Sequence, residues 1–262
     1  MYERSCGFKR QSGCDISLDY EGGQGNGKVV CLCMEVHKEG TLSEYGHRGG
    51  GESEVYDVSE SVVYNMDCME YMKTLPDKAF DLAIVDPPYG IKRLERKEGR
   101  LEKYGDSAIA NNAVPTSEYF DELFRVSKNQ IVWGGNYFNL PPCRCFIVWY
   151  KHQPIENYSD CEFAWTSFDR PAKVFDYQYF GNVNQDLQRI HPTQKPVALY
   201  EWLLTRFARE RERVLDTHVG SGSSRIACAE LGFDFVGCEI DKGFWEKEEK
   251  RFKEYSDQLT LF

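Results

Sequence analysis

The fold of this chain is indicated by one stretch of sequence, Leu82-Ala83-Ile84-Val85-Asp86-Pro87-Pro88-Tyr89-Gly90. Its four apolar residues, bounded by Asp and Pro-Pro, predict a buried parallel strand that ends abruptly. Neither proline can donate a hydrogen bond to a sheet, and each restricts the residue before it, so the chain leaves the strand extended. The carboxyl end of this strand then presents a carboxylate, two free carbonyls and an aromatic ring at the edge where open α/β sheets bind ligands.

This edge suits a planar ligand that carries an amino group. Tyr89 can stack on such a ring, while the Asp86 carboxylate and the Pro87 carbonyl accept its two N–H protons. The alternative is an ordinary Asp-Pro-Pro turn, because such dipeptides are common in loops. The rest of the sequence distinguishes these two interpretations.

Length and composition limit the classes of protein to consider. The chain has 262 residues, enough to bury a sizeable core in one large domain or two small ones. No apolar run approaches the length of a membrane span, and residues 1–10 lack the apolar core of a signal peptide, so we expect a cytoplasmic protein. The net charge of −10 argues against a protein that coats nucleic acid non-specifically, although it permits a local basic surface.

The cysteines indicate reduced thiols. There are ten, in a chain without a secretory signal. Two Cys-x-Cys pairs, Cys31/Cys33 and Cys143/Cys145, suggest a zinc site, but structural zinc usually shows Cys-x-x-Cys or Cys/His spacing. We therefore expect small buried side chains and no metal.

The sequence divides into a glycine-rich extension, a folded region and a short tail. Eleven of the 22 glycines lie in residues 1–54, which show no hydrophobic periodicity and are expected to be largely disordered. Residues 55–257 alternate strand and helix patterns, which predicts an α/β domain with a mixed, mostly parallel sheet flanked by helices. Within this domain, residues 169–190 are the remaining candidate for a small insert, and residues 258–262 form the tail.

Individual elements of the domain follow from periodicity and from proline and glycine positions. Pro196 is typical of the first position of a helix. Strands are predicted at 61–64, 80–85, 130–133, 145–150, 162–166, 173–179, 213–216 and 233–238. Helices are predicted at 67–75, 117–127, 197–208, 223–231 and 244–255.

A second motif, Asp216-Thr217-His218-Val219-Gly220-Ser221-Gly222, connects an apolar strand to the helix at 223–231. Glycines let the backbone approach a ligand closely, and the N-terminus of the helix faces that ligand. Glu239 ends the next strand, about twenty residues after the glycine turn, where an acid is suited to hold ribose hydroxyls. This order of elements predicts a site for an adenosine-containing cofactor.

Two other patterns each allow two interpretations. The segment Asp67-Cys68-Met69-Glu70 has the spacing of a capping box, so Asp67 is a helix N-cap, a polar group at the cofactor site, or both. After Gly90, a polar loop is either a solvated segment or a contact for a phosphate backbone. Its basic residues are Lys92, Arg93, Arg96, Lys97, Arg100 and Lys103.

With both motifs in view, residues 60–256 resemble the β class of DNA amino-methyltransferases, in which Asp-Pro-Pro-Tyr precedes Gly-x-Gly as it does here. The resemblance implies a Rossmann-like methyltransferase fold with permuted motif order and S-adenosylmethionine as cofactor. It implies methyl transfer to the exocyclic amino group of a base flipped out of double-stranded DNA. Asp at the first motif position favours adenine N6. Cytosine N4, an RNA amino-methyltransferase and a catalytically silent DNA-binding module are the alternatives.

The same resemblance assigns site residues. The catalytic motif comprises Asp86, Pro87, Pro88 and Tyr89. The segment 191–196, His-Pro-Thr-Gln-Lys-Pro, matches the family motif that flanks the methionine end of the cofactor, and His218 stands where the family usually has Phe. The implied cofactor-binding residues are Asp67, Cys68, Asp86, His191, Thr193, Lys195, Asp216, His218, Gly220, Ser221, Gly222, Ser223, Glu239 and Ile240.

The tail carries an independent resemblance. Gln258-Leu259-Thr260-Leu261-Phe262 is similar to the short peptide by which bacterial proteins bind the replication sliding clamp. In such a complex Leu259, Leu261 and Phe262 would fill an apolar groove, and Gln258 would make a polar contact. The alternative is a frayed terminus that folds back on the domain.

Overall fold

The computed structural model describes residues 60–91, 113–153, 156, 158–179 and 189–260, together with the backbone of residues 15–17 and 28–30. These two backbone segments form a short antiparallel ladder of β1 (Asp15–Ser17) and β2 (Lys28–Val30). The rest of the predicted extension at 1–54 lies outside the described residues. So do the six basic residues of the loop at 92–103 and the last two residues of the tail.

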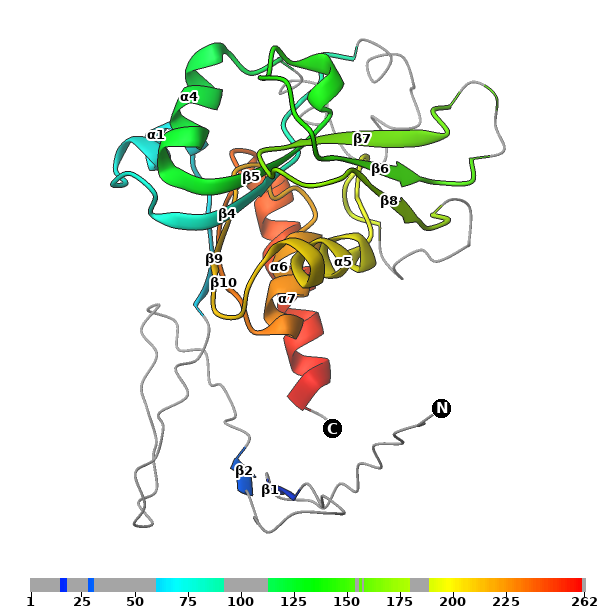
Figure 1. Ribbon diagram of the computed structural model, residues 1–262. Coiled ribbons are helices and arrows are strands. Elements are labelled where there is room, and N and C mark those ends of the chain that lie inside the picture. Colours follow the sequence, from blue (N-terminus) through cyan, green and yellow to red (C-terminus); the bar gives the residue numbers. More distant parts are fainter. Residues whose placement is uncertain are drawn as a thin grey trace. The chain divides into compact units, whose positions relative to one another are not determined.

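An eight-stranded sheet forms the centre of the unit Asp57–Tyr255, with strand order β3-β10-β9-β4-β5-β7-β6-β8 (Figure 1). The first five strands in this order run parallel to one another, β7 runs antiparallel to both β5 and β6, and β8 runs parallel to β6. The expected mixed, mostly parallel sheet is confirmed. The strands are β3 (Ser61–Tyr64), β4 (Phe80–Val85), β5 (Ser127–Trp133), β6 (Phe146–Tyr150), β7 (Cys161–Thr166), β8 (Lys173–Asp176), β9 (Arg213–Asp216) and β10 (Asp234–Cys238).

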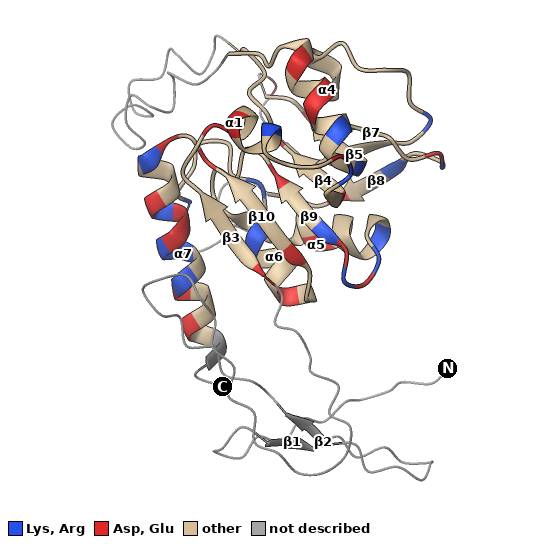
Figure 2. Cartoon of the chain, turned by 90° about the vertical axis from the view of Figure 1, so that its left-hand side faces the viewer, with Lys and Arg blue, Asp and Glu red and all other residues tan. Residues whose placement is uncertain are grey.

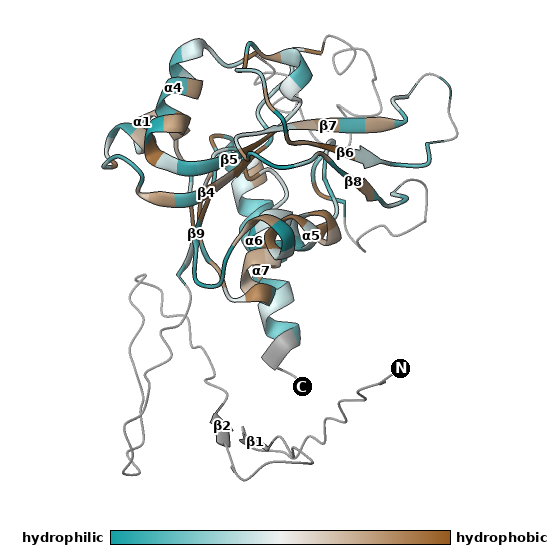
Figure 3. Ribbon diagram, viewed as in Figure 1, coloured by the Kyte–Doolittle hydropathy of each residue, from teal (hydrophilic) through white to brown (hydrophobic). Residues whose placement is uncertain are grey.

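Helices cover both faces of this sheet (Figure 1). On one face lie α1 (Cys68–Lys73) and α4 (Ser117–Val126), and on the other α5 (Val197–Phe207), α6 (Ser223–Leu231) and α7 (Lys242–Thr260). In β4, Leu82 and Ile84 pack into the core beneath α5 and α6, whereas Ala83 and Val85 pack toward α1 and α4. Because both faces of β4 are buried from Leu82 to Val85, this part of the strand is continuously apolar, as the colouring of Figure 3 shows.

The two sequence motifs follow two adjacent strands. β4 and β9 are parallel neighbours that pair Leu82 with Val214 and Ala83 with Leu215. From β4 the chain continues through α4 to β5 on one side, and from β9 it continues through α6 to β10 on the other. Open α/β sheets bind ligands at such a reversal of strand order. The fold therefore places both motifs at one position, although they are far apart in the sequence.

The ends of several elements differ from those predicted. The predicted strand 173–179 ends at Asp176, and Pro196 immediately precedes the first residue of α5 instead of being that residue. β8 pairs with β6 and is therefore an edge strand of the sheet within the predicted insert 169–190, of which residues 180–188 lie outside the described ranges.

The largest difference concerns the last helix, predicted at 244–255. α7 begins at Lys242 and continues to Thr260, so Gln258 is helical and exposed rather than part of an extended tail. Charges of both signs alternate along this helix in Figure 2, and two pairs at i,i+4 support it: Lys242–Glu246 and Lys250–Glu254, each 3.7 Å apart. Among the helices that the structure describes, none is long and apolar enough to cross a membrane.

Candidate functional site

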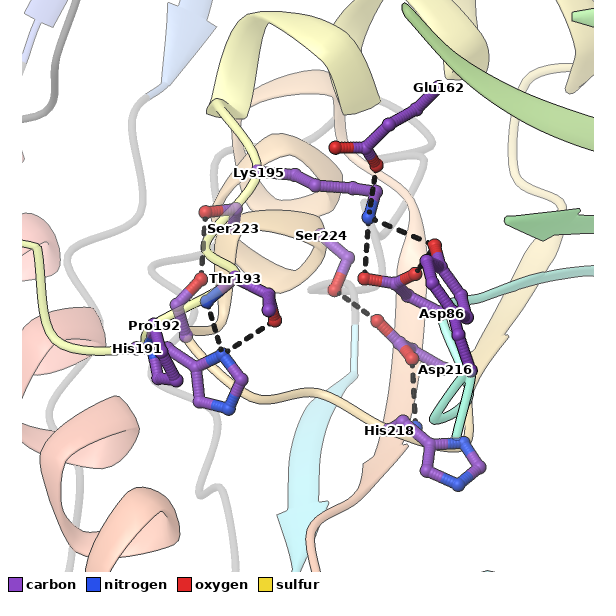
Figure 4. Close-up of polar contacts among 12 residues, drawn as sticks. Asp86, Glu162, His191, Pro192, Thr193, Lys195, Asp216, His218, Ser223 and Ser224 are labelled. Carbon is purple, nitrogen blue, oxygen red and sulfur yellow. Dashed lines mark hydrogen bonds and ion pairs between the residues drawn. The ribbon is translucent and has the colours of Figure 1, made fainter. Parts of the chain in front are cut away.

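The Asp86 carboxylate lies at the carboxyl end of β4 and is held by two donors (Figure 4). The Tyr89 hydroxyl donates a hydrogen bond to Oδ1, and Lys195 Nζ donates to Oδ2 at 2.6 Å. Pro87 is buried, whereas Asp86 and Tyr89 are partly exposed. A carboxylate oxygen can accept more than one hydrogen bond, so Asp86 retains acceptor capacity for a ligand.

Tyr89 packs against the turn that follows β5. Burial, reinforced by the neighbouring Asp86 charge, raises the pKa of Tyr89 well above its ordinary value, so its hydroxyl stays protonated. Its ring stacks on Tyr137, with centroids 5.0 Å apart and ring planes 12° apart. Gly134 has φ +70°, and a Cβ at that position would lie 2.1 Å from Tyr89 Cε1. The Tyr89 position therefore requires glycine at 134.

Lys195 lies beside the Asp86 carboxylate. The resemblance assigns it to the cofactor, but its ammonium contacts the Asp86 carboxylate and lies 3.0 Å from Glu162 Oε2. Its side chain is only 4% exposed. Burial acts to lower the pKa of Lys195, and the carboxylates of Asp86 and Glu162 outweigh this effect and raise it. Lys195 is therefore a charged group of the Asp86 site.

The Asp216 carboxylate organises the glycine turn after β9. Oδ1 accepts the backbone N–H of His218 at 3.0 Å, and Oδ2 accepts the Ser224 hydroxyl at 2.6 Å. Burial raises the pKa of Asp216 to about 7. Gly220 and Gly222 have φ of +56° and +73°, and a Cβ on Gly222 would lie 2.6 Å from Glu248 Oε1. The tight turn therefore needs glycine for its backbone conformation and, at 222, for space.

Glu239 connects this turn to the end of β10. Its Oε2 accepts the N–H of Gly220 and its Oε1 accepts the N–H of Asp241, both at 2.9 Å. Burial raises the pKa of Glu239. The next residue, Ile240, exposes 54% of its surface. Each carboxylate oxygen of Glu239 has a further lone pair. Glu239 therefore offers hydrogen-bond acceptors next to the apolar surface of Ile240.

The segment before α5 brings His191 beside Gly220. A Cβ on Gly220 would lie 3.6 Å from the imidazole ring, whose other neighbours include Phe244 at 4.4 Å between ring centroids. The Thr193 hydroxyl lies 3.1 Å from His191 Nδ1. Burial lowers the pKa of His191 to about 3, which keeps the ring neutral at physiological pH.

His218, within the glycine turn, is a second neutral imidazole. Its Nδ1 lies 2.9 Å from the Thr217 hydroxyl, which also hydrogen-bonds the Tyr119 hydroxyl at 2.7 Å. The His218 ring stands edge-on to Tyr119 with centroids 5.5 Å apart. Burial lowers the pKa of His218 to about 4. This aromatic contact agrees with the Phe that the resemblance leads one to expect at this position.

Two hydrogen-bond groups complete the cofactor side. Asp67 is the N-cap of α1, where its Oδ1 accepts the Met69 N–H at 2.7 Å, so the capping interpretation is confirmed. Arg251 of α7 donates from Nη1 to the Ser221 carbonyl at 2.6 Å and to the Ser223 hydroxyl at 3.0 Å. Both groups are anchored by the helices that flank the glycine turn.

The sequence missed several residues of this arrangement. Glu162 carries no motif and lies on β7, and the contacts of Tyr137 and Gly134 with Tyr89 depend on tertiary structure. Arg251 lies on α7, where the sequence motifs assign no site residue. Within the described ranges, no group of three or more His, Cys, Asp or Glu residues is arranged to hold a metal.

The sequence is similar to those of known DNA methyltransferases. A family model described as DNA methylase matches residues 165–250. The type II methyltransferase M.HinfI of Haemophilus influenzae is 23% identical over 240 aligned residues, which cover 72% of this chain and 67% of M.HinfI. M.HpaI of Haemophilus parainfluenzae is 27% identical over 236 residues, covering 71% of this chain and 72% of M.HpaI. Residues 165–250 thus match the DNA methylase family, and the chain as a whole is similar in sequence to type II methyltransferases.

A solved structure of a methyltransferase is also similar. The crystal structure of the M1.HpyAVI–SAM complex matches with a TM-score of 0.47 and 22% sequence identity, over 72% of this chain and 98% of that one. The match to a DNA methylase family and the similarity to type II methyltransferases agree with the predicted type of reaction, and M1.HpyAVI itself was crystallised as a complex with SAM.

Proposed function

We propose that this methylase transfers a methyl group from S-adenosylmethionine to N6 of an adenine flipped out of double-stranded DNA. The supporting observation is the position of Asp86 and Tyr89 beside the Gly220–Gly222 turn, at the carboxyl ends of the adjacent strands β4 and β9. One strand thus carries a group that binds an amine, and its neighbour carries a turn that suits a nucleoside.

Asp86 and Pro87 bind the target amino group in this proposal. The Asp86 carboxylate and the Pro87 carbonyl accept its two N–H protons, while Tyr89 stacks on the base. The base has to leave the duplex because its amino group is otherwise within the stacked helix. The hydrogen bonds direct the nitrogen lone pair toward the methyl group, and the Asp86 carboxylate takes the proton that the nitrogen loses on methylation. Positioning and electrostatics therefore supply most of the acceleration.

The chemistry of the second group of residues fits S-adenosylmethionine. Glu239 has free lone pairs for ribose hydroxyls beside the exposed Ile240, and the glycine turn offers close backbone approach. Neutral His191 adds no positive charge that would repel a sulfonium. When bound, the cofactor supplies an electrophilic methyl group. The proposed cofactor residues are Asp67, Cys68, Asp86, His191, Thr193, Asp216, His218, Gly220, Ser221, Gly222, Ser223, Glu239 and Ile240.

Adenine is the proposed base because Asp occupies the first position of the Asp86 motif. The basic loop at 92–103 is proposed to contact the DNA backbone, with part of the segment 169–190 reading the base sequence. Since that segment is short, we expect a short or degenerate recognition site.

The test is to express the full chain in a bacterial host that lacks DNA methylation and to sequence its genomic DNA by a single-molecule method. Asp86→Ala is the control, because it removes the proposed amine acceptor. Modified adenines within one sequence motif, absent from the control, are the expected result. Modified cytosines would retain the mechanism and overturn the base assignment, whereas unmodified DNA from the wild-type chain would contradict the proposal.

The C-terminal residues are proposed to bind a bacterial replication sliding clamp. Gln258 is exposed at the end of α7, with Leu259, Leu261 and Phe262 after it. Binding to an apolar groove in extended form would require the last helical turn to unwind, which is inexpensive at a helix terminus. A chain truncated after Asp257 should lose binding to purified clamp and keep its methylation activity. Equal clamp binding by the truncated and full chains would refute this assignment.

A further inference from the structure

Four side chains of alternating charge form a series of ion pairs that ends at the Asp86 carboxylate. Lys151 Nζ lies 3.1 Å from Glu162 Oε1, Lys195 Nζ lies 3.0 Å from Glu162 Oε2, and the same Lys195 Nζ lies 2.6 Å from Asp86 Oδ2. They come from four separate segments: the residue after β6, strand β7, the segment before α5, and the end of β4. In Figure 4 the Lys195 side chain extends between Glu162 and Asp86.

Lys195 is the most deeply buried member of this set. Its side chain is 4% exposed, against 17% for Asp86 and 27% for Glu162. The ammonium also lies 3.5 Å from the Tyr89 hydroxyl and 5.4 Å from the centre of the Trp133 ring. A buried ion pair adds little net stability compared with well-packed apolar side chains. Stability alone therefore does not explain the buried ammonium at this position. Its contact with Asp86 indicates a role in catalysis.

The contacts restrain the Asp86 carboxylate from two sides. The Tyr89 hydroxyl donates to one oxygen and the Lys195 ammonium to the other, which leaves the carboxylate a single orientation. Glu162 restrains Lys195 in turn, because its carboxylate forms an ion pair with the same ammonium at 3.0 Å. Glu162 carries its negative charge at neutral pH: burial acts to raise its pKa, but Lys195 and Lys151 hold it at about 2.

We propose that Lys195 and Glu162 are positioning residues for methyl transfer: Glu162 anchors the Lys195 ammonium, which holds the Asp86 carboxylate in place and aimed at the amino group. The inference rests on the proposed function, in which Asp86 accepts that amino group. It replaces the prediction that Lys195 binds the cofactor.

The charges around Asp86 give this proposal a pH signature. The titratable groups that interact with it from the surrounding elements are Tyr89, Tyr119, Lys195, Tyr200 and Asp216, and Glu162 lies next to it on the far side of Lys195. Within this set Lys195 is the one cation. Without it, the titratable groups around Asp86 would all be acidic or neutral, and nearby like charges disfavour the ionised form of a carboxyl group. Loss of Lys195 should therefore shift the acid limb of the rate profile to higher pH.

The experiment measures single-turnover methyl transfer to duplex DNA containing the motif found by sequencing, across about pH 6 to about pH 9. Lys195→Met should lower the rate at neutral pH about 100-fold and move the acid limb upward, and Glu162→Gln should lower the rate about tenfold. The dissociation constant of S-adenosylmethionine, measured by calorimetry, should stay within about twofold of wild type in both variants. Loss of a direct contact with the cofactor would instead change it about tenfold. Lys128→Met is the matched control, because Lys128 makes a 2.6 Å ion pair with Asp81 at the opposite end of β4, with 56% of its side chain exposed.

A double variant separates the effect on Asp86 from a loss of structure. Lys195→Met leaves Glu162 without its buried partner, so thermal unfolding is measured first. Lys195→Met with Glu162→Gln removes both charges and should recover part of the rate and of the pH profile; if Lys195→Met alone unfolds, Glu162→Gln and the double variant carry the test. A wild-type rate and profile in the folded variants would overturn the proposal.

Two other outcomes are equally decisive. Loss of S-adenosylmethionine binding in proportion to the rate would also overturn the proposal and return Lys195 to the cofactor site. A wild-type chain that methylates no DNA would instead refute the proposed function on which the inference rests.

Discussion

At the scale of single residues, the packing of the site depends on a glycine that no residue with a side chain could replace. Gly134 lies so near Tyr89 that a Cβ would be 2.1 Å from the ring, whereas Gly232, with almost the same φ of +72°, has nothing within 4 Å of an added Cβ. The two glycines thus share a backbone conformation and differ in their surroundings. Their substitution separates backbone strain from displacement of Tyr89.

Gly134→Ala should lower the rate of methyl transfer about 100-fold, because a displacement of about 1 Å at a reacting group has an effect of that size. Gly232→Ala should leave the rate unchanged. Both variants should lose about 1–2 kcal/mol of stability, since alanine is strained in the left-handed conformation. Single-turnover kinetics and urea unfolding measure the two effects, and equal rates in both variants would contradict the role of the Gly134 contact.

His218 gives the stability of the protein a specific pH dependence. Burial lowers its pKa from 6.5 to about 4. Between these values the unfolded chain binds a proton that the native chain does not, so stability falls as pH falls from about 6.5 toward 4. His218→Phe cannot bind that proton and keeps a ring against Tyr119. Between pH 7 and pH 5 it should lose about 2 kcal/mol less free energy of unfolding than the wild type does. Urea denaturation at the two pH values measures this, and parallel losses would exclude the mechanism.

Residue roles were predictable where the cause is local. Asp67 caps its helix through a neighbour two residues away, and the sequence pattern predicts that contact. Lys195 is close to His191 and Thr193 in sequence, which suggested a shared ligand, but the chain turns between them and directs Lys195 to Asp86. Glu162 has no sequence signal, because a glutamate in a half-buried strand is ordinarily a surface residue.

Helix α7 has a role at the level of elements that the sequence did not indicate. Its Arg251 holds the Ser221 carbonyl and the Ser223 hydroxyl, and its Glu248 is buried against Gly222. Glu248 also lies 3.1 Å from Nη1 of Arg225 on α6. The glycine turn is therefore supported from outside the sheet by the helix that follows β10.

Arg251→Ala should weaken binding of S-adenosylmethionine about tenfold, because hydrogen bonds from a charged group contribute about 1.5–3 kcal/mol and a tenfold change is about 1.4 kcal/mol. Lys250→Ala is the control on the same helix, with a side chain 76% exposed in a 3.7 Å pair with Glu254. Calorimetric titration compares them. If both variants bind the cofactor like wild type, α7 does not support the turn.

The elements themselves were largely predictable, because strong periodicity reflects which faces are buried. β4 was predicted with its observed ends, since Asp and Pro-Pro terminate it chemically. α7 was predicted too short because most residues at its two ends are polar and carry no apolar period; the Lys242–Glu246 pair supports its first turn instead.

At the scale of the whole molecule, the sequence predicted a parallel α/β sheet but not the order of its strands. The adjacency of β4 and β9 follows from packing across the full sheet, and no local pattern encodes it. The motif after β4 and the motif after β9 could therefore each be recognised in the sequence. Contacts between elements required the structure, and an example is the ion pair of Glu162 on β7 with Lys195 before α5.

The pairing of β4 with β9 also sets how far apart the two reactants are held. Leu82 faces Val214 and Ala83 faces Leu215, so the amine-binding and methyl-supplying segments emerge at a spacing defined by backbone hydrogen bonds. Slipping one strand by a single residue would move one segment about 3.3 Å along the other and turn its side chains to the opposite face. Reacting atoms have to meet within about 3–3.5 Å. The distance at which the reacting atoms have to meet is thus no larger than the shift caused by one residue along a strand. A one-residue insertion in either strand would therefore separate the two reactants even if each binding site remained intact.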